Sequence, residues 1–135
     1  MMRQIVVDTS ALCALVDRDD RYHHAVEIFL NENAAQIMLL VTDYVLDETL
    51  TWVKSRFGSR SALKLGRRLR SSNFCAFVKL TAEDEEATWR VFEKYDDKDW
   101  SYTDCSCLAL MQRVGIHETL STDHHFDQMD VIRWP

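Results

Sequence analysis

Three short apolar runs, each followed by a segment with helical periodicity, constrain the fold of this chain more than any other feature. The runs are IVV at residues 5–7, IMLLV at 37–41 and FCAFVKL at 74–80. Such runs are typical of strands buried on both faces, as in a parallel sheet. Because strands that alternate with helices form doubly wound sheets, the sequence predicts an α/β fold.

The remaining elements follow from the same periodicities. Helices are expected over 10–17, 20–31, 43–57, 59–71, 82–95 and 102–114, and strands over 3–7, 37–41, 74–80, 118–122 and 131–134. Thr81 and Asp84 have the spacing of a capping box at the start of one helix, and Gly115 is expected to end another. The prediction is a three-layer α/β/α fold with a mainly parallel sheet of four to five strands.

Length and composition favour one domain over residues 1–135. The chain has 135 residues with only 3 Gly and 1 Pro, so no linker is expected. No apolar run approaches the ~18 residues of a membrane span. The cysteines are Cys13, Cys75, Cys105 and Cys107, which lie in apolar segments without Cys-x-x-Cys spacing. They indicate reduced core thiols and a cytoplasmic protein with no membrane contact.

Positive charge is concentrated in one segment of an acidic chain. The net charge is −6, yet residues 54–72 contain seven Lys or Arg and no acid, so the remainder carries −6 − 7 = −13. Helical periodicity places four cations on one face: Arg60, Lys64, Arg67 and Arg68. A solvated helix surface and a stripe that contacts nucleic-acid phosphates are both compatible with this pattern.

Two acids stand out in the first half of the chain. Asp8 follows directly after the first apolar run, where it could cap a helix or belong to a ligand site at the carboxyl end of a strand. Glu48 shares a helical face with Val45 and Trp52, whereas the adjacent Asp47 is expected to face away. Glu48 could form a salt bridge to a neighbouring helix or point into a site.

Two further acids lie in the second half. Asp104 is three residues after Ser101, so it could close a capping box, but it also shares a face with the buried Cys107 and Met111. Asp123 ends an expected strand, as Asp8 does. Two acids at strand ends and two on inward helix faces could therefore converge in one crevice, with Asp43 and Asp47 outside it.

Four motifs in order resemble the PIN-domain nucleases, in particular VapC-like toxins. They are IVVDTSAL, VTDYVLDETL, DKDWSYTDCSCLALM and TLSTDHHF, and together they extend over essentially the whole chain. The resemblance implies a PIN-like fold with an acidic quartet as metal ligands and catalytic residues: Asp8, Glu48, Asp104 and Asp123. It also implies supporting residues around these carboxylates: Thr9, Ser10, Thr103, Thr122 and, with a weaker match, Asp127.

Clustered carboxylates repel one another unless a cation lies among them. Oxygen ligands without a converging Cys or His favour Mg²⁺ or Mn²⁺, and the pairs His23–His24 and His124–His125 are assigned to the surface or to supporting positions. The expected function is metal-dependent RNA hydrolysis by the toxin of a toxin–antitoxin pair. RNA, an antitoxin and a second copy of the chain are the expected partners. A non-catalytic interaction module and a haloacid dehalogenase-type phosphatase are the alternatives, although Ser10 occupies the position where that phosphatase needs a second aspartate.

Overall fold

A computed structural model describes residues 2–135, and its centre is one parallel five-stranded sheet. The strands are β1 (Arg3–Val7), β2 (Ile37–Thr42), β3 (Cys75–Val78), β4 (Glu118–Leu120) and β5 (Ile132–Trp134). Their order across the sheet is β3-β2-β1-β4-β5. Strands β2 and β3 therefore lie on one side of β1, and β4 and β5 lie on the other side of β1. Ligand sites of open parallel sheets lie outside the strand ends where the order reverses.

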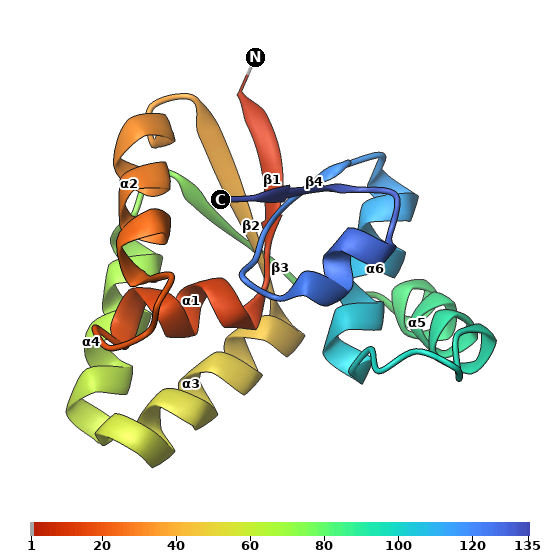
Figure 1. Cartoon of the computed structure of the whole chain (residues 1–135), viewed down its shortest axis with the longest axis horizontal. Coiled ribbons are helices and arrows are strands. Elements are labelled where there is room, and N and C mark those ends of the chain that lie inside the picture. Colours follow the sequence, from red (N-terminus) through yellow and green to blue (C-terminus); the bar gives the residue numbers. More distant parts are fainter. Residues whose placement is uncertain (1) are drawn as a thin grey trace.

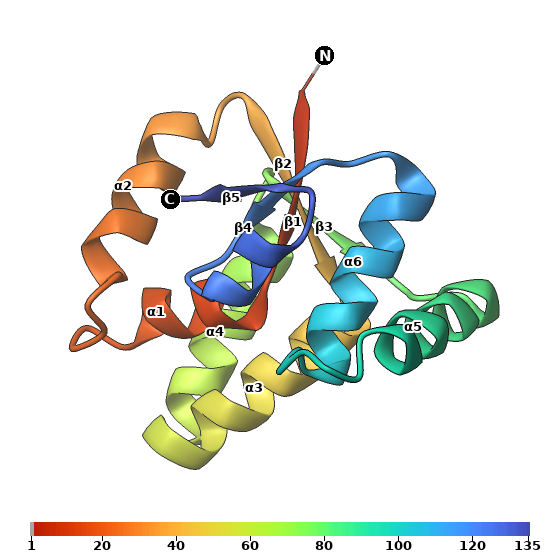
Figure 2. The same cartoon turned by 45° about the vertical axis from the view of Figure 1, so that its right-hand side comes forward.

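Six α-helices cover this sheet from both sides (Figures 1 and 2). They are α1 (Thr9–Val16), α2 (His23–Asn33), α3 (Asp43–Phe57), α4 (Ser59–Ser71), α5 (Ala82–Lys94) and α6 (Tyr102–Val114). In both views α1, α2 and α4 lie on one side and α5 and α6 on the other. Helix α3 starts at the carboxyl end of β2 and extends toward α4. The expected three-layer α/β/α fold is confirmed, with all strands parallel.

The predicted boundaries of three helices agree with the structure, including those of α4, which has no side-chain N-cap. Helices α3, α4 and α6 have the predicted bounds, and Gly115 ends α6 in the left-handed conformation at φ 73°. Helix α2 begins at His23, three residues later than expected, because residues 17–22 form a hydrogen-bonded turn. The short helix η1 (His124–Gln128) was not predicted. Its five residues are too few for a helical periodicity to be recognised.

An ion pair fastens α5 to α6. Asp84 is 1% exposed and is held by both the Nε and the Nη2 of Arg113, the latter at 3.0 Å from Oδ2. The same carboxylate closes the capping box with Thr81 that the sequence predicts. Hydrogen bonds from Arg113 lower the pKa of Asp84 below its usual value. This contact holds α6 against α5. It thereby also holds the amino end of α6 near the sheet.

Within residues 2–135, no helix has both the length and the apolar composition that a membrane crossing requires.

Replacement of Asp84 by Asn should destabilise the fold by about 2 kcal/mol, because a hydrogen-bonded carboxylate beside Arg113 is lost. Because the folded-state pKa of Asp84 is lowered, its ionised carboxylate stabilises the fold. This stabilisation is present above the unfolded-state pKa and is lost as the pH falls through the folded-state pKa. Urea unfolding at neutral pH and at about pH 3 measures both effects. The exposed neighbour Glu83 provides a control, Glu83→Gln. Equal losses for both variants would contradict the assigned role.

Candidate active site

The carboxyl ends of β1 and β4 lie side by side at the point where the strand order reverses. Val7 pairs with Leu120 in the parallel register, and the Asp8 N–H donates to the Leu120 carbonyl at 2.9 Å. Asp8 at the end of β1 therefore lies next to residues 121–123, which follow β4. Although it is charged, Asp8 is only 3% exposed.

Hydroxyl groups hold one oxygen of the Asp8 carboxylate. The Ser10 hydroxyl donates to Oδ2 at 2.7 Å and the Ser121 hydroxyl donates to the same atom at 3.1 Å. Ser121 thus has the supporting role that was expected of Thr122, whose backbone N–H instead donates to the Ser10 Oγ at 3.0 Å. The Thr9 hydroxyl is buried without a hydrogen-bond partner among residues 2–135.

Asp104 combines the two roles that the sequence left open. Its Oδ2 accepts from the Ser101 N–H at 2.9 Å, which closes the capping box of α6. It is also only 4% exposed, and its charge acts on Asp8. Asp104 is therefore both a helix cap and a member of an acidic cluster.

Asp123 and His125 complete this cluster with Asp104. The three side chains each offer a ligand atom, and these atoms lie within 4.8 Å of one another. His125 Nδ1 lies 3.1 Å from Asp123 Oδ1 and 3.5 Å from Asp104 Oδ2, yet it forms a hydrogen bond with neither. The expectation that no histidine converges on the acids is wrong, because η1 turns His125 back toward them. The donor set of carboxylates and one imidazole fits a divalent cation.

Each of the three aspartates caps a helix with one of its oxygens. Asp8 caps α1 by accepting the Ser10 N–H, and Asp123 caps η1 by accepting the His125 N–H. Asp104 does so within α6. The positive ends of three helix dipoles therefore face the cluster, which reduces the repulsion between the carboxylates. The second oxygen of each aspartate remains available to a ligand.

Burial and mutual repulsion raise the pKa of these acids. Burial is the main reason that the pKa of Asp8 rises to about 6, and the charge of Asp104 adds to it. The pKa of Asp104 is also raised, by burial and by Asp123. Above pH 6 the cluster therefore concentrates negative charge in a buried site, which is the condition under which a cation binds best.

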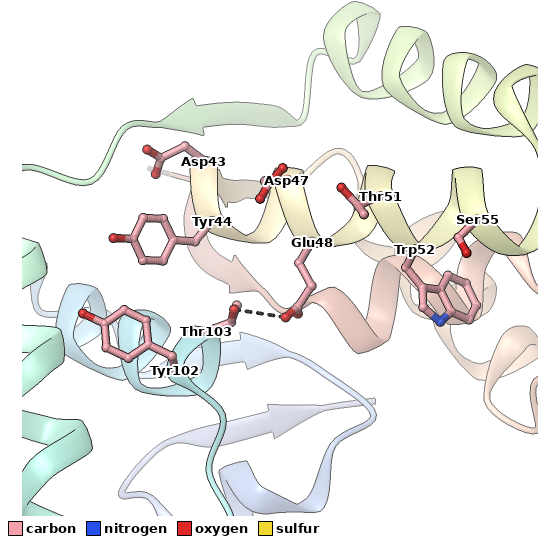
Figure 3. A pocket seen from close by; sticks show the side chains of 9 residues that line it. All are labelled: Asp43, Tyr44, Asp47, Glu48, Thr51, Trp52, Ser55, Tyr102 and Thr103. Atoms are coloured by element: carbon pink, nitrogen blue, oxygen red, sulfur yellow. Dashed lines mark hydrogen bonds between the residues drawn. The ribbon is translucent and has the colours of Figure 1, made fainter.

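Glu48 reaches the same region from α3, along an open groove (Figure 3). Its Oε2 accepts a hydrogen bond from Thr103, the residue before Asp104, at 3.1 Å. Burial and the charges of Asp8, Asp104 and Glu48 raise the pKa of the Cys107 thiol well above its usual value. These three acids therefore lie around one buried thiol, although Glu48 is itself exposed rather than inward-facing.

The expected separation of Glu48 from its acidic neighbours is only partly correct. Asp43 and Asp47 line the same groove as Glu48, together with the aromatic rings of Tyr44 and Tyr102. The two tyrosines stack with their ring centroids 6.2 Å apart. Figure 3 shows Glu48 extending toward Thr103 on α6, whereas Asp43 and Asp47 lie farther from that helix. The groove is acidic and aromatic, and within it Glu48 accepts a hydrogen bond from Thr103, the residue next to Asp104 in sequence.

Asp127 lies outside the cluster of Asp104, Asp123 and His125. Its carboxylate accepts from Arg133 Nε at 2.9 Å and lies 3.0 Å from His124 Nδ1. These contacts lower its pKa. They indicate that Asp127 fastens η1 to β5.

The cations of α4 do not form one face toward the acids. Lys64 and Arg68 line a groove shared with the end of α1, whereas Arg67 lines another groove between α3 and α4. Arg60 is exposed and lines neither of them. Helix α4 lies on the far side of α1 and α3 from α6 (Figure 1).

Comparison with known proteins agrees with this geometry. The model of the PIN domain family matches residues 5–132. The chain is 29% identical over 122 residues to the 23S rRNA-specific endonuclease VapC20 of Mycobacterium tuberculosis H37Rv, with 90% of this chain and 91% of that protein aligned. It is also 29% identical over 126 residues to the ribonuclease VapC26 of that strain, covering 93% and 91%.

Solved structures give the same result. The crystal structure of M. tuberculosis VapC20, a sarcin–ricin loop cleaving toxin, superposes with a TM-score of 0.86 at 26% identity over 95% of this chain and 96% of that one. VapBC2 of Rickettsia felis, bound to a promoter DNA fragment, shares the fold at 9% identity, with a TM-score of 0.76 over 98% and 99% of the chains. The chain therefore belongs to the PIN domain family, as a VapC-like member.

Proposed function

We propose that this chain is a metal-dependent endoribonuclease and the toxin of a toxin–antitoxin pair. The observation that carries the proposal is the meeting of Asp8, Asp104 and Asp123 where the strand order reverses, with the ligand atoms of Asp104, Asp123 and His125 within 4.8 Å. Four carboxylates that include Glu48 are the catalytic and metal-binding residues in this proposal. Neutral hydroxyls orient two of these groups: Ser10 and Ser121 donate to Asp8, and Thr103 donates to Glu48.

A bound Mg²⁺ or Mn²⁺ ion supplies Lewis acidity toward a phosphodiester and an activated water. Asp8, Asp104 and Asp123 would hold the ion with the oxygens that their helix caps leave available. Glu48 lines the adjoining groove and accepts a hydrogen bond from Thr103, and we assign its carboxylate the role of orienting a water or accepting a proton from it. Thr103 is a positioning residue, because it acts on the reaction through Glu48. A haloacid dehalogenase-type phosphatase requires a second aspartate two residues after the first. Here Ser10 occupies that position, and its hydroxyl donates a hydrogen bond to Asp8.

Relatives indicate the substrate and the partners. VapC20 is a 23S rRNA-specific endonuclease, and its similarity covers 90% of this chain, so we propose RNA, with ribosomal RNA as the first candidate. The cations of α4 would supply positive charge for its backbone. An antitoxin protein and a second copy of this chain are the proposed protein partners, and the cytoplasm the proposed location.

Glu48→Gln should lower RNA cleavage in Mn²⁺ by about 100-fold, because a proton-accepting carboxylate near the reacting water is lost. Asp47→Asn is the matched control. It removes the adjacent acid in the same groove and should retain most of the activity. Initial rates on a fluorescent RNA measure both. The role of Glu48 would be rejected if Asp47→Asn were the more damaging change.

Addition of Mn²⁺ should raise the melting temperature of the wild type. At ~100 times the dissociation constant, binding adds about 2.7 kcal/mol of stability. Asp123→Asn should abolish this gain, whereas Asp130→Asn, which removes an exposed acid beyond η1, should keep it. Thermal melts with Mg²⁺, Mn²⁺ and Zn²⁺ would also rank the ions. A wild type that gains nothing from any of them would exclude metal ligation here.

The stability of the metal-free protein should depend on the protonation of Asp8. Its pKa in the fold is about 6, above the unfolded value, so the stability that its proton confers is present below the unfolded pKa and is lost as the pH rises through about 6. In EDTA, the stability of wild type relative to Asp8→Asn should fall by about 2.4 kcal/mol between pH 4 and pH 7, because each pKa unit is worth 1.36 kcal/mol and the unfolded-state group is already partly ionised at pH 4. Urea unfolding across this range tests it, and a constant difference would contradict it.

A further inference from the structure

A groove of about 230 Å³ lies at the opposite end of α1 from the acidic cluster. Its polar lining consists of Arg18 from the connection between α1 and α2, of Ser61, Lys64 and Arg68 from α4, and of His23 and Glu27 from α2. The segment with Arg18, His23 and Glu27 is distant in sequence from α4, so of the groove cations the sequence pattern placed only Lys64 and Arg68 on one surface. With three cations and one carboxylate, the lining carries a formal charge of about +2 at neutral pH.

The three cations are available to a ligand. Among residues 2–135, none of Arg18, Lys64 and Arg68 forms an ion pair, and all three are exposed. Glu27 faces His23 instead, with its Oε2 3.4 Å from Nε2. Cations without partners on an otherwise acidic protein are favoured positions for an anion.

The acids next to Arg18 in sequence are engaged within their own turn. Asp17 Oδ1 accepts from the Asp19 N–H at 3.0 Å, and Asp20 Oδ1 accepts from the Tyr22 N–H at 2.8 Å. Neither acid lines the groove. Their carboxylates therefore order the turn that carries Arg18, and they do not pair with it.

A buried histidine fixes the position of this turn. His23 is 7% exposed, and its Nδ1 lies 2.8 Å from the Ala14 carbonyl oxygen of α1. This hydrogen bond joins the start of α2 to the end of α1. On the other wall, Leu65 and Leu69 bury the apolar face of α4. The cations thus project from elements whose positions are set by packing.

We propose that this groove binds a backbone phosphate of the RNA on one side of the bond that is cleaved. The inference deepens the proposed ribonuclease function and rests on it. Asp8 lies at the start of α1 and the groove at its end, and the eight residues of α1 measure about 12 Å. Because α1 extends from the acidic site to the groove (Figure 1), we infer that one RNA strand that runs along α1 occupies both sites.

Charge favours a phosphate over other occupants. An RNA strand that approaches the acidic cluster is repelled by the carboxylates, so its binding requires compensating positive charge along the same path. Guanidinium groups and an ammonium group are the side chains that bind phosphate best. Such contacts neutralise the backbone without reading bases, so they position the RNA and leave sequence recognition to other surfaces.

The test is the salt dependence of RNA binding in EDTA, where no cleavage occurs. The ligand is a fluorescent single-stranded RNA of mixed sequence. Arg18→Gln combined with Arg68→Gln removes two groove cations, and the slope of log affinity against log salt should fall by about 1.4. At about 0.1 M salt the affinity should fall about 25-fold relative to the wild type. Lys64→Gln alone should reduce the slope by about half as much.

Arg90→Gln combined with Lys98→Gln is the matched control. It makes the same change in net charge at exposed residues outside the groove and should leave the slope close to that of the wild type. Melting temperatures equal to the wild type establish that both variants fold. A groove variant that binds RNA as the control does would overturn the inference. Loss of affinity for a polyglutamate peptide, with RNA binding retained, would also overturn it and assign the groove to an acidic protein segment.

Binding and cleavage separate this inference from the proposed function. If the wild type cleaves RNA but the groove variant binds as the control does, the groove is not a phosphate site and the ribonuclease assignment stands. If the groove variant loses RNA affinity but the wild type cleaves no RNA in Mn²⁺, the groove is an RNA site and the ribonuclease assignment fails.

Discussion

Holding several carboxylates within one small volume is the requirement on which the rest of this structure depends. Asp8 and Asp104 are nearly fully buried, and burial and mutual repulsion both raise their pKa values. The fold offsets this cost by placing each aspartate of the cluster at the amino end of a helix, where backbone N–H groups and the helix dipole stabilise a negative charge. Serine hydroxyls add further donors to Asp8. The aspartates can therefore stay ionised, and a bound cation can neutralise their negative charges.

The strand order explains why these helix ends meet. Because β4 pairs with β1 rather than with β3, the segment that carries Asp123 lies beside Asp8, and α6 approaches the same end of the sheet. The ion pair between Asp84 and Arg113 holds α6 through α5. The acidic site is thus a consequence of topology. Arg18, Lys64 and Arg68 line a groove at the far end of α1, about the length of one short helix from Asp8.

Local sequence was sufficient for the elements and for several roles within them. Helices α3, α4 and α6 have the predicted bounds because caps and apolar periodicity are properties of a few neighbouring residues. The same holds for Asp84 and Asp104, whose capping boxes are both present. The motif order indicated the family that the comparisons show. The sequence raised helix capping and ligand binding as alternative roles for Asp8 and Asp104. A carboxylate has two oxygens, so one oxygen can cap a helix while the other binds a ligand.

What the sequence determined by itself was therefore the alternation of strands and helices, the helix caps and the acids at the ends of β1 and β4. Tertiary structure alone decided which side chains meet across elements. Ser121 supports Asp8, His125 turns into the acidic cluster, and Arg18 joins Lys64 and Arg68. Helical phase placed Glu48 and Asp47 on different faces, but a groove between α3 and α6 receives both. The physical reason is that phase and capping act over a few residues, whereas contacts between distant segments depend on strand order and packing.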